Sequence, residues 1–317
     1  MIKVDLITGF LGSGKTTFLL KYARYLMKQG LRIGILEYDY GAINVDMLLL
    51  NKLRGPKCEL EMVAAACDED CLRRRFSTKL ISMAMSGYDR VIIEPSGVFD
   101  MDMFFDALRD DPLEKWYEIG SVITIVNSNL SDKLSKEEDF YLASQAASAG
   151  SIVFSRSQLS TPEKIEETKL HIVNAAEAIH CKKLRDTIDK RMLVKDWDEF
   201  TDEDFKKLSN CGYVIGDYMK LIAGSASDFS TLYYLGLTDN LESIRIKMEK
   251  LFEGTEYGNV IRMKGFVCDE GGSYQINASQ YEQIIAPVSI GQGVMIVIGT
   301  ELNKVKIDEL MNMESHG

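Results

Sequence analysis

A glycine-rich segment near the amino terminus, residues 9–17, restricts what this chain can fold into more than any other feature. It reads GFLGSGKTT and satisfies the pattern GxxxxGK[ST]. A short apolar run typical of a strand, residues 4–8, precedes it, and residues 16–28 show apolar side chains at helical spacing. Between a strand and a helix, such glycines let the backbone curl so that successive N–H groups point at phosphate oxygens. The sequence therefore predicts a phosphate-binding loop, to which the helix adds its positive end.

The side chains of this loop have definite chemical roles. The Lys15 ammonium would reach the β and γ phosphates of a nucleoside triphosphate, and the Thr16 hydroxyl would ligate Mg²⁺. Lys15 is therefore also a candidate catalytic residue. The residues expected to hold the nucleotide are Gly9, Gly12, Ser13, Gly14, Lys15, Thr16 and Thr17.

Short apolar runs alternate with helical patterns through the first half of the chain. After the first strand, the runs are residues 32–37, 90–94, 122–127 and 152–155. This alternation is typical of a parallel sheet that helices cover on both faces. We predict an α/β fold, in which the nucleotide-binding domain has a mainly parallel sheet.

The second half of the chain shows a different pattern. One helix is predicted over residues 162–184, and a polar, weakly periodic stretch follows. From residue 229 the order is strand, helix, three strands and a closing helix, which suits a smaller α+β domain with an antiparallel sheet. We assign residues 1–222 to the nucleotide-binding domain, with a helical linker over about 186–222, and residues 223–317 to the second domain.

Composition excludes several classes of partner. A net charge of −11 disfavours nucleic acid, and no Lys/Arg stripe interleaved with aromatic residues reverses it. No apolar stretch approaches the roughly 20 residues that cross a bilayer, and the amino terminus lacks the pattern of a secretion signal. The six cysteines are spread thinly, which argues for a reducing compartment. We expect a cytoplasmic protein that binds neither nucleic acid nor membrane.

A phosphate loop of this kind needs an acidic group at the end of a neighbouring strand, to hold Mg²⁺ or to position the attacking water. Glu94 ends the run RVIIE and is the first candidate; the alternative is an exposed carboxylate that only ends a strand. Gly97, three residues later, would let the backbone pass close to the γ-phosphate. Asp39 is a second candidate for contact with Mg²⁺ or for positioning the nucleophile, and its alternative is an ordinary polar loop residue.

Several segments together resemble the CobW-like P-loop GTPases, metallochaperones related to UreG and HypB, the nickel-insertion GTPases of urease and hydrogenase. GFLGSGKTT matches the phosphate loop of that family, EYDYGAINVD resembles its NEFGxxxID switch segment, and EPSGVFD resembles its ETSGLADP segment. Near the other end, VIRMKGF and VMIVIG resemble its carboxyl-terminal domain. The resemblance spans nearly the whole chain. It implies GTP hydrolysis and the delivery of a transition metal to an acceptor protein.

The base-reading segment departs from the family's pattern. The family's NKxD aligns with Ser155, Arg156, Ser157 and Gln158. An Asp at the last position accepts hydrogen bonds from two guanine N–H groups and thereby rejects adenine. A Gln amide carries a donor and an acceptor and could serve either base, while Arg156 could lay its stem along the ring. GTP is expected from the resemblance, and ATP is the alternative. A further departure is Asn127, where the family has Asp.

The metal motif departs as well, because the family's GCxCC falls where this chain reads ACDEDC. Cys67 and Cys71 are four residues apart, so on a helix both thiols would lie on one face and could share one ion. Thiolates with open coordination positions suit Zn²⁺ or Co²⁺ that is to be handed on. The alternative is that these cysteines are small buried hydrophobic residues with inert thiols.

Two functions from different classes fit these observations. In the first, hydrolysis of a Mg²⁺-bound triphosphate releases ordered switch loops. This release changes how strongly the chain binds a transition metal that is to be delivered to an acceptor metalloprotein. In the second, the chain is a nucleotide-dependent module that docks on or reactivates a cofactor-dependent partner enzyme and carries no metal. A small-molecule kinase is a third possibility, for which the sequence offers no lid or acceptor site. Whether the chain forms a homodimer is left open.

Overall fold

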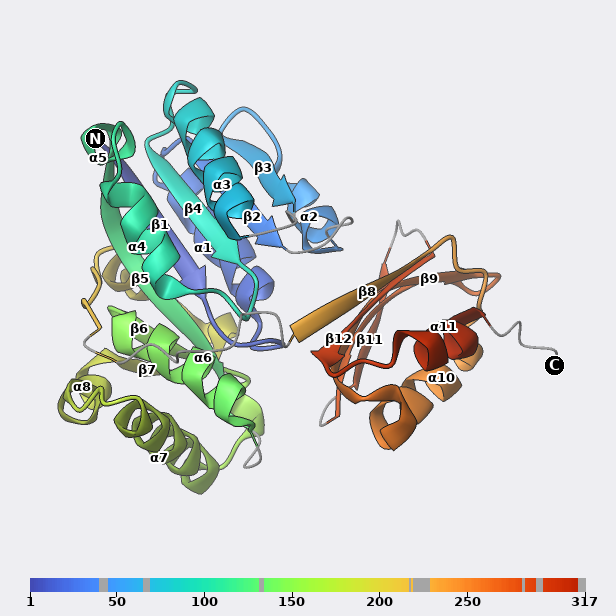
Figure 1. Cartoon of the computed structure of the whole chain (residues 1–317). Helices are drawn as coiled ribbons and strands as arrows, with labels where there is room; N and C mark the ends of the chain where they lie inside the picture. The colour runs from blue at the N-terminus through green and yellow to red at the C-terminus, as the bar shows by residue number, and fades with distance from the viewer. Residues whose placement is uncertain are drawn as a thin grey trace. The chain divides into compact units, whose positions relative to one another are not determined.

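A seven-stranded sheet organises the larger of the two units of this chain. In the computed structural model the described residues are 1–39, 45–64, 69–130, 134–216, 218, 229–280, 283–288 and 293–312. The chain divides into unit 1, Met1–Tyr40 with Asp46–Leu221, and unit 2, Gly41–Val45 with Ile222–Gly317. Figure 1 shows the sheet of each unit with its own helices.

The sheet of unit 1 is parallel throughout, as its order and pairing show. The order is β3-β2-β4-β1-β5-β6-β7, and each neighbouring pair is parallel. The strands are β1 (Ile2–Thr8), β2 (Ile33–Asp39), β3 (Cys58–Ala64), β4 (Arg90–Pro95), β5 (Tyr117–Asn127), β6 (Ser151–Ser155) and β7 (Met192–Val194). Every residue of β4 is buried, as expected for a strand covered on both faces. The predicted α/β class is confirmed.

Helices cover both faces of this sheet, and alternate residues of β5 show how. Val122 and Val126 pack toward one helical layer, whereas Ile123 and Ile125 pack toward the other. The first layer contains α3 (Glu69–Ala84), α4 (Met101–Arg109), α5 (Leu113–Trp116), α6 (Lys136–Ser148), α7 (Pro162–Ala178) and α8 (Lys183–Arg191). The second contains α1 (Lys15–Lys28), the short helix η1 (Asn51–Leu53) and α9 (Asp202–Leu208). The remaining short helices of unit 1 are α2 (Val45–Leu50), η2 (Ser157–Leu159) and η3 (Trp197–Glu199).

The helix expected over residues 162–184 is two helices in the structure. α7 ends at Ala178, because His180 adopts a left-handed backbone conformation with φ of 67°, and α8 begins at Lys183. The polar stretch that follows also contains β7 and α9. Leu184, Ile188, Phe205 and Leu208, which lie in this region, are all buried in unit 1. Residues 183–208 are thus packed structure.

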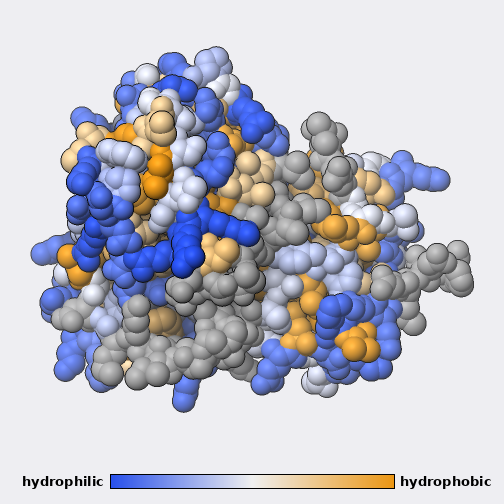
Figure 2. All heavy atoms as spheres, turned by 45° about the horizontal axis from the view of Figure 1, so that its top comes forward, coloured by the Kyte–Doolittle hydropathy of each residue, from blue (hydrophilic) through white to orange (hydrophobic). Residues whose placement is uncertain are grey.

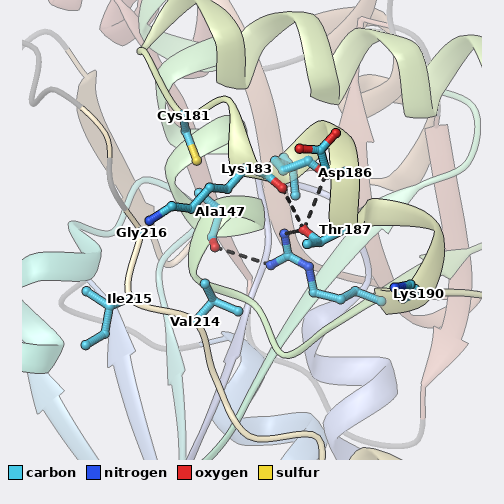
Figure 3. Close-up of a pocket in the computed structure, with 11 residues that line it drawn as sticks. Ala147, Cys181, Lys183, Asp186, Thr187, Lys190, Val214, Ile215 and Gly216 are labelled. Carbon is cyan, nitrogen blue, oxygen red and sulfur yellow. Dashed lines mark hydrogen bonds between the residues drawn. The ribbon is translucent and has the colours of Figure 1, made fainter.

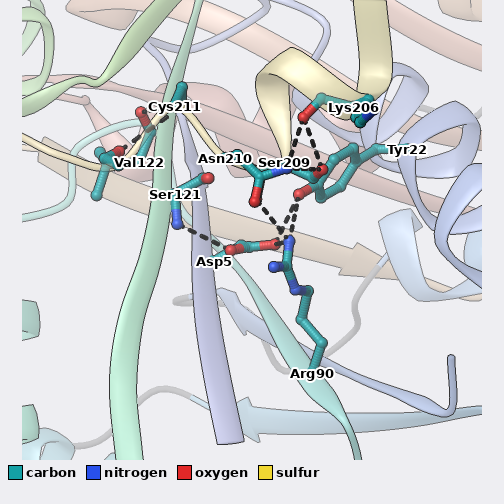
Figure 4. A network of polar contacts seen from close by, with 10 residues as sticks. Asp5, Tyr22, Arg90, Ser121, Val122, Lys206, Ser209, Asn210 and Cys211 are labelled. Atoms are coloured by element: carbon teal, nitrogen blue, oxygen red, sulfur yellow. Dashed lines mark hydrogen bonds and ion pairs between the residues drawn. The ribbon is translucent and has the colours of Figure 1, made fainter. Parts of the chain in front are cut away.

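A buried polar network joins β1, β4 and α1 (Figure 4). Arg90 Nη1 donates to Asp5 Oδ2 at 2.9 Å and to the Ser209 carbonyl at 3.1 Å, and the Tyr22 hydroxyl donates to the same Asp5 oxygen at 2.7 Å. The other Asp5 oxygen accepts from the Ser121 backbone N–H at 2.9 Å. Burial raises the pKa of Asp5, and Arg90 opposes this shift. Strands β1, β4 and β5 therefore meet at one satisfied polar centre.

Unit 2 is built on an antiparallel sheet of five strands. Their order is β11-β10-β9-β12-β8, with bounds β8 (Phe229–Leu235), β9 (Asn259–Asp269), β10 (Gly272–Ser279), β11 (Gln283–Val288) and β12 (Val294–Thr300). Two helices, α10 (Leu241–Glu253) and α11 (Lys304–Asn312), share a core with the sheet, and η4 (Thr255–Tyr257) precedes β9. This arrangement agrees with the α+β fold expected for the second half.

Polar residues cover much of the face seen in Figure 2, with smaller apolar patches among them. Within the described parts of the chain, we find no helix with both the length and the apolar character that crossing a bilayer requires.

The buried network allows a prediction about stability. Replacing Arg90 with Met leaves the fully buried Asp5 carboxylate without its cation, so the free energy of unfolding should fall by about 3–5 kcal/mol. Urea unfolding measures the change. Lys28→Met, which removes the exposed pair with Asp202, is the control and should have a much smaller effect. Equal losses in the two variants would show that the network does not hold the sheet together.

Candidate nucleotide site

The glycines of the phosphate loop have backbone conformations that other residues rarely adopt. Gly14, directly before α1, is left-handed with φ of 99°. At Gly9, where φ is 148°, an added Cβ would lie 2.3 Å from the Ile125 carbonyl oxygen. The loop between β1 and α1 can therefore take this shape only with glycine at these positions.

Lys15 lies within the curve of this loop. Its side chain is 7% exposed, and the ammonium donates to the Gly9 carbonyl oxygen at 2.9 Å. This contact joins the first residue of α1 to Gly9, the first residue of the glycine-rich segment. The ammonium is thus held beside the backbone N–H groups that the motif offers to phosphate.

Thr16 and Glu94 meet across 78 residues of sequence. The Thr16 hydroxyl donates to Glu94 Oε1 at 2.7 Å. Glu94 stands near the end of β4 and is only 3% exposed, so it is not a surface carboxylate. The structure thus brings together the two residues predicted to hold Mg²⁺.

A second buried carboxylate, which the sequence analysis did not single out, lies beside the first. Glu37 on β2 is 2% exposed and is the register partner of Glu94 on β4. Two adjacent carboxylates repel each other in a poorly solvated place, and a divalent cation stabilises both in the ionised form. A signal was present in the sequence, because GILE and RVIIE are parallel apolar runs that both place Glu near the carboxyl end of a strand.

Gly97 lies against the phosphate loop. It is buried, and an added Cβ would be 2.5 Å from the Leu11 backbone nitrogen. The segment after β4 therefore approaches the loop closely enough that only glycine fits. The approach of Gly97 to the γ-phosphate, which the sequence predicts, stays a prediction.

Some of the residues predicted to bind a transition metal or to act in the switch segment are not fully described by the structure. Asp39 is the last residue of β2, but its side chain is not described, and Cys67 also lies outside the described ranges. Cys71, in α3, is half-buried and forms no disulfide. Among the residues that the structure does describe, no group of three or more His, Cys, Asp or Glu side chains is arranged to hold a metal ion.

The predicted base-reading segment lies next to the phosphate loop. Arg156 has a left-handed backbone conformation, with φ of 56°, and its Nη1 donates to the Gly12 carbonyl at 3.3 Å. Ser155 is buried, and its hydroxyl donates to the Val126 carbonyl at 3.3 Å. Gln158, in η2, is exposed. Arg156 is therefore anchored on the loop, while Gln158 is open to solvent.

Asn127, which replaces an Asp of the family pattern, has a local structural contact. Its Oδ1 accepts from the backbone N–H of Asn129 at 3.0 Å, and so stabilises the turn after β5.

Trp197 lies beside the phosphate loop and was not predicted from the sequence. A Cβ added to Gly14 would lie 3.3 Å from the indole ring, and the indole N–H donates to the Phe154 carbonyl at 2.9 Å. The ring also packs edge-on against Phe18 of α1, with centroids 5.5 Å apart. Trp197 is one of only two tryptophans, in an otherwise polar stretch, which was the available signal.

Comparison with known proteins decides the family. The model of the CobW/HypB/UreG nucleotide-binding domain matches residues 3–180, which is more than half of the chain. The chain belongs to the CobW/HypB/UreG family. With the phosphate loop described above, this CobW/HypB/UreG member is a P-loop NTPase, and the resemblance inferred from the sequence is confirmed.

Two curated relatives are zinc chaperones of Escherichia coli (strain K12). YeiR is 28% identical over 165 residues, which cover 51% of this chain and 49% of YeiR. YjiA is 25% identical over 185 residues, which cover 56% of this chain and 52% of YjiA. This CobW/HypB/UreG member therefore spans about half the length of the curated relatives it matches.

Solved structures of the family are more distant in sequence. The crystal structure of Zn(II)-bound YjiA GTPase from E. coli is 16% identical, with a TM-score of 0.37, and the match covers 98% of this chain and 97% of YjiA. HypB from Helicobacter pylori in complex with nickel is also 16% identical, with a TM-score of 0.37, and the match covers 66% of this chain and 84% of HypB.

A separate cavity of about 370 Å³ is found in unit 1 (Figure 3). Its lining comes from α8, from Ala147 and Cys181, and from the segment 214–216. None of the residues predicted to bind nucleotide lines this cavity.

Trp197 should report nucleotide binding by its fluorescence. Because its ring lies against Gly14, binding of nucleotide to the loop should produce a saturable change in emission in a Trp116→Phe variant, where Trp197 is the remaining tryptophan. Parallel titrations with GTP and ATP would give the base preference. Trp116, 38% exposed before the start of β5, is the control: a Trp197→Phe variant should show no change. Emission that changes equally in both variants would contradict the placement of Trp197.

Proposed function

We propose that this chain binds GTP with Mg²⁺, hydrolyses it, and couples hydrolysis to the delivery of a transition metal to an acceptor protein. The observation that carries the hydrolytic part is the contact between Thr16 and Glu94 beside the phosphate loop. A P-loop NTPase needs a hydroxyl and an acidic group at this position. Here the half-buried Thr16 donates to the buried Glu94 carboxylate. Family membership supports guanine as the base.

The residues present suit Mg²⁺. Mg²⁺ prefers oxygen ligands and usually binds through one or two carboxylates together with substrate phosphates. The Thr16 hydroxyl and the Glu94 carboxylate would hold it, with Glu37 adding negative charge beside them. When bound, the cation would supply charge neutralisation at the β and γ phosphates.

The chain's own groups would do the remaining work. The backbone N–H groups of the loop and the Lys15 ammonium would bind phosphate oxygens and stabilise the charge that develops during transfer. Glu94, shielded from solvent, would orient the attacking water, and Asp39 would help to position it. The P-loop fold fixes these groups before the substrate arrives, so little reorganisation is needed.

The metal part of the proposal rests on the relatives and on the cysteines. YeiR and YjiA are described as zinc chaperones, and Cys67 and Cys71 are four residues apart. We propose Zn²⁺ as the first metal to test, with Co²⁺ second, and an acceptor metalloprotein as the partner. The cysteines among the described residues form no disulfide, which supports a cytoplasmic location.

Removing the Glu94 carboxylate tests the hydrolytic role. In Glu94→Gln, hydrolysis of GTP should fall by about a hundredfold or more, since the carboxylate that would hold Mg²⁺ and orient the attacking water is lost. Phosphate release with GTP and with ATP measures the rate. Glu61→Gln is the matched control and should hydrolyse normally, because Glu61 lies on the edge strand β3, which β2 separates from β4, and pairs with Lys79. An undiminished rate in Glu94→Gln would exclude the proposed role.

The cysteine pair can be tested directly with Zn²⁺. In competition with a chromophoric chelator and with a non-hydrolysable GTP analogue present, a Cys67→Ser, Cys71→Ser variant should bind Zn²⁺ at least about tenfold more weakly than the unmodified chain, because serine is a poor ligand for this ion. Cys268→Ser, in unit 2, should leave binding unchanged. Unaltered Zn²⁺ binding in the double variant would remove the metal part and favour an interaction module that carries none.

A further inference from the structure

Gln145 is a buried polar side chain that the site described so far does not use. It lies near the end of α6 and is fully buried. Its Nε2 donates to the Gly97 carbonyl oxygen at 3.1 Å. Gly97 in turn lies against Leu11 of the phosphate loop, where an added Cβ would be 2.5 Å from the Leu11 nitrogen. The Gly97 peptide is therefore placed between the phosphate loop and Gln145.

The end of α6 that carries Gln145 is held firmly. The last carbonyls of a helix lack partners within the helix, and here other side chains supply them. The Thr124 hydroxyl of β5 donates to the Gln145 carbonyl at 2.9 Å. Arg191 Nη1 donates to the carbonyls of Ala147 and Ala149, at 3.3 and 2.8 Å. These hydrogen bonds hold in place the backbone that carries the Gln145 side chain.

The amide of Gln145 is only half satisfied. Its Oε1 is buried and has no hydrogen-bond partner among the described residues. A buried acceptor without a donor is unfavourable, whereas a methionine of similar volume would avoid that cost. An amide at this position is therefore poorly explained by packing alone, and its one bond, to Gly97, is what distinguishes it from an apolar side chain.

We propose that Gln145 is a positioning residue, which holds the Gly97 peptide in the orientation that recognises the γ-phosphate. This inference rests on the proposed function and on the approach of Gly97 to that phosphate, which the sequence predicts. Gln145 fixes the carbonyl side of the peptide after Gly97, so it limits the rotation of the Gly97 backbone beside the loop. It acts through Gly97 and does not itself touch the nucleotide.

The readout that separates positioning from a structural role is the preference for triphosphate over diphosphate. Isothermal titration of the full chain with a non-hydrolysable GTP analogue and with GDP, each with Mg²⁺, gives the ratio of the two affinities. In Gln145→Met the ratio should fall by about tenfold, since only the triphosphate loses a contact. Ser144→Ala is the control, because Ser144 directly precedes Gln145 on α6 and its hydroxyl donates to the Tyr141 carbonyl of the same helix; this variant should keep the ratio. Equal weakening of both ligands would assign Gln145 a structural role and overturn the proposal.

A second variant uses pH to restore the donor. Glu has the shape of Gln, and burial raises the pKa of a carboxyl group, so Gln145→Glu is deprotonated at high pH and protonated at lower pH. Only the protonated form can donate to the Gly97 carbonyl. The triphosphate preference of Gln145→Glu should therefore recover as pH falls from about 8.5 to about 6, while the unmodified chain and Gln145→Met show no such recovery. A flat profile in Gln145→Glu would overturn the proposal.

Failure of the proposed function gives a different result. If the unmodified chain shows no preference for the triphosphate analogue and releases no phosphate, the function proposed for the nucleotide site is wrong. If the unmodified chain hydrolyses GTP and the ratio is insensitive to both Gln145 variants, only the inference about Gln145 is wrong.

Discussion

The buried ion pair between Arg90 and Asp5 joins the strands on which the site depends. β1 leads into the phosphate loop, and β4 leads to Glu94 and Gly97. Because Arg90 begins β4 and Asp5 lies within β1, their contact helps to align the two strands, and Tyr22 adds α1 to the same centre. A charge pair removed from water tolerates little displacement, since each partner would be left uncompensated. The meeting of Thr16 and Glu94 at the other end of the strands depends on this alignment.

The sequence predicts some parts of this architecture well because the backbone there has few alternatives. The phosphate loop requires glycine at particular backbone angles, so its pattern of residues is sufficient to identify it. β4 was predicted because it is buried on both faces and reads as a continuous apolar run. By contrast, β3 lies at the edge of the sheet, and its Glu59 and Glu61 interrupt the apolar pattern, so it was missed. The end of α7 was also missed, because His180 takes a left-handed conformation without being glycine.

The candidate site shows the same division. Lys15, Thr16 and Gly97 could be predicted because each follows directly from a motif. Glu37 and Trp197 carry only weak signals in the sequence, since their importance arises from neighbours that are distant in sequence. For Glu37 this is the register of β2 with β4, and for Trp197 it is a ring that reaches Gly14 across more than 180 residues. Arg156 was expected to contact the base with its stem, and the structure adds that its guanidinium is anchored on the carbonyl of Gly12.

The way the chain leaves unit 1 gives α6 a second significance. The backbone N–H of Val214 donates to the carbonyl of Ser148, the last residue of α6, at 3.1 Å. Ser148 is three residues beyond Gln145, less than one helical turn away. The two residues therefore share the turn of helix that Thr124 and Arg191 hold in place. The same anchored end of α6 therefore holds both the Gly97 segment, through Gln145, and residue 214, through Ser148.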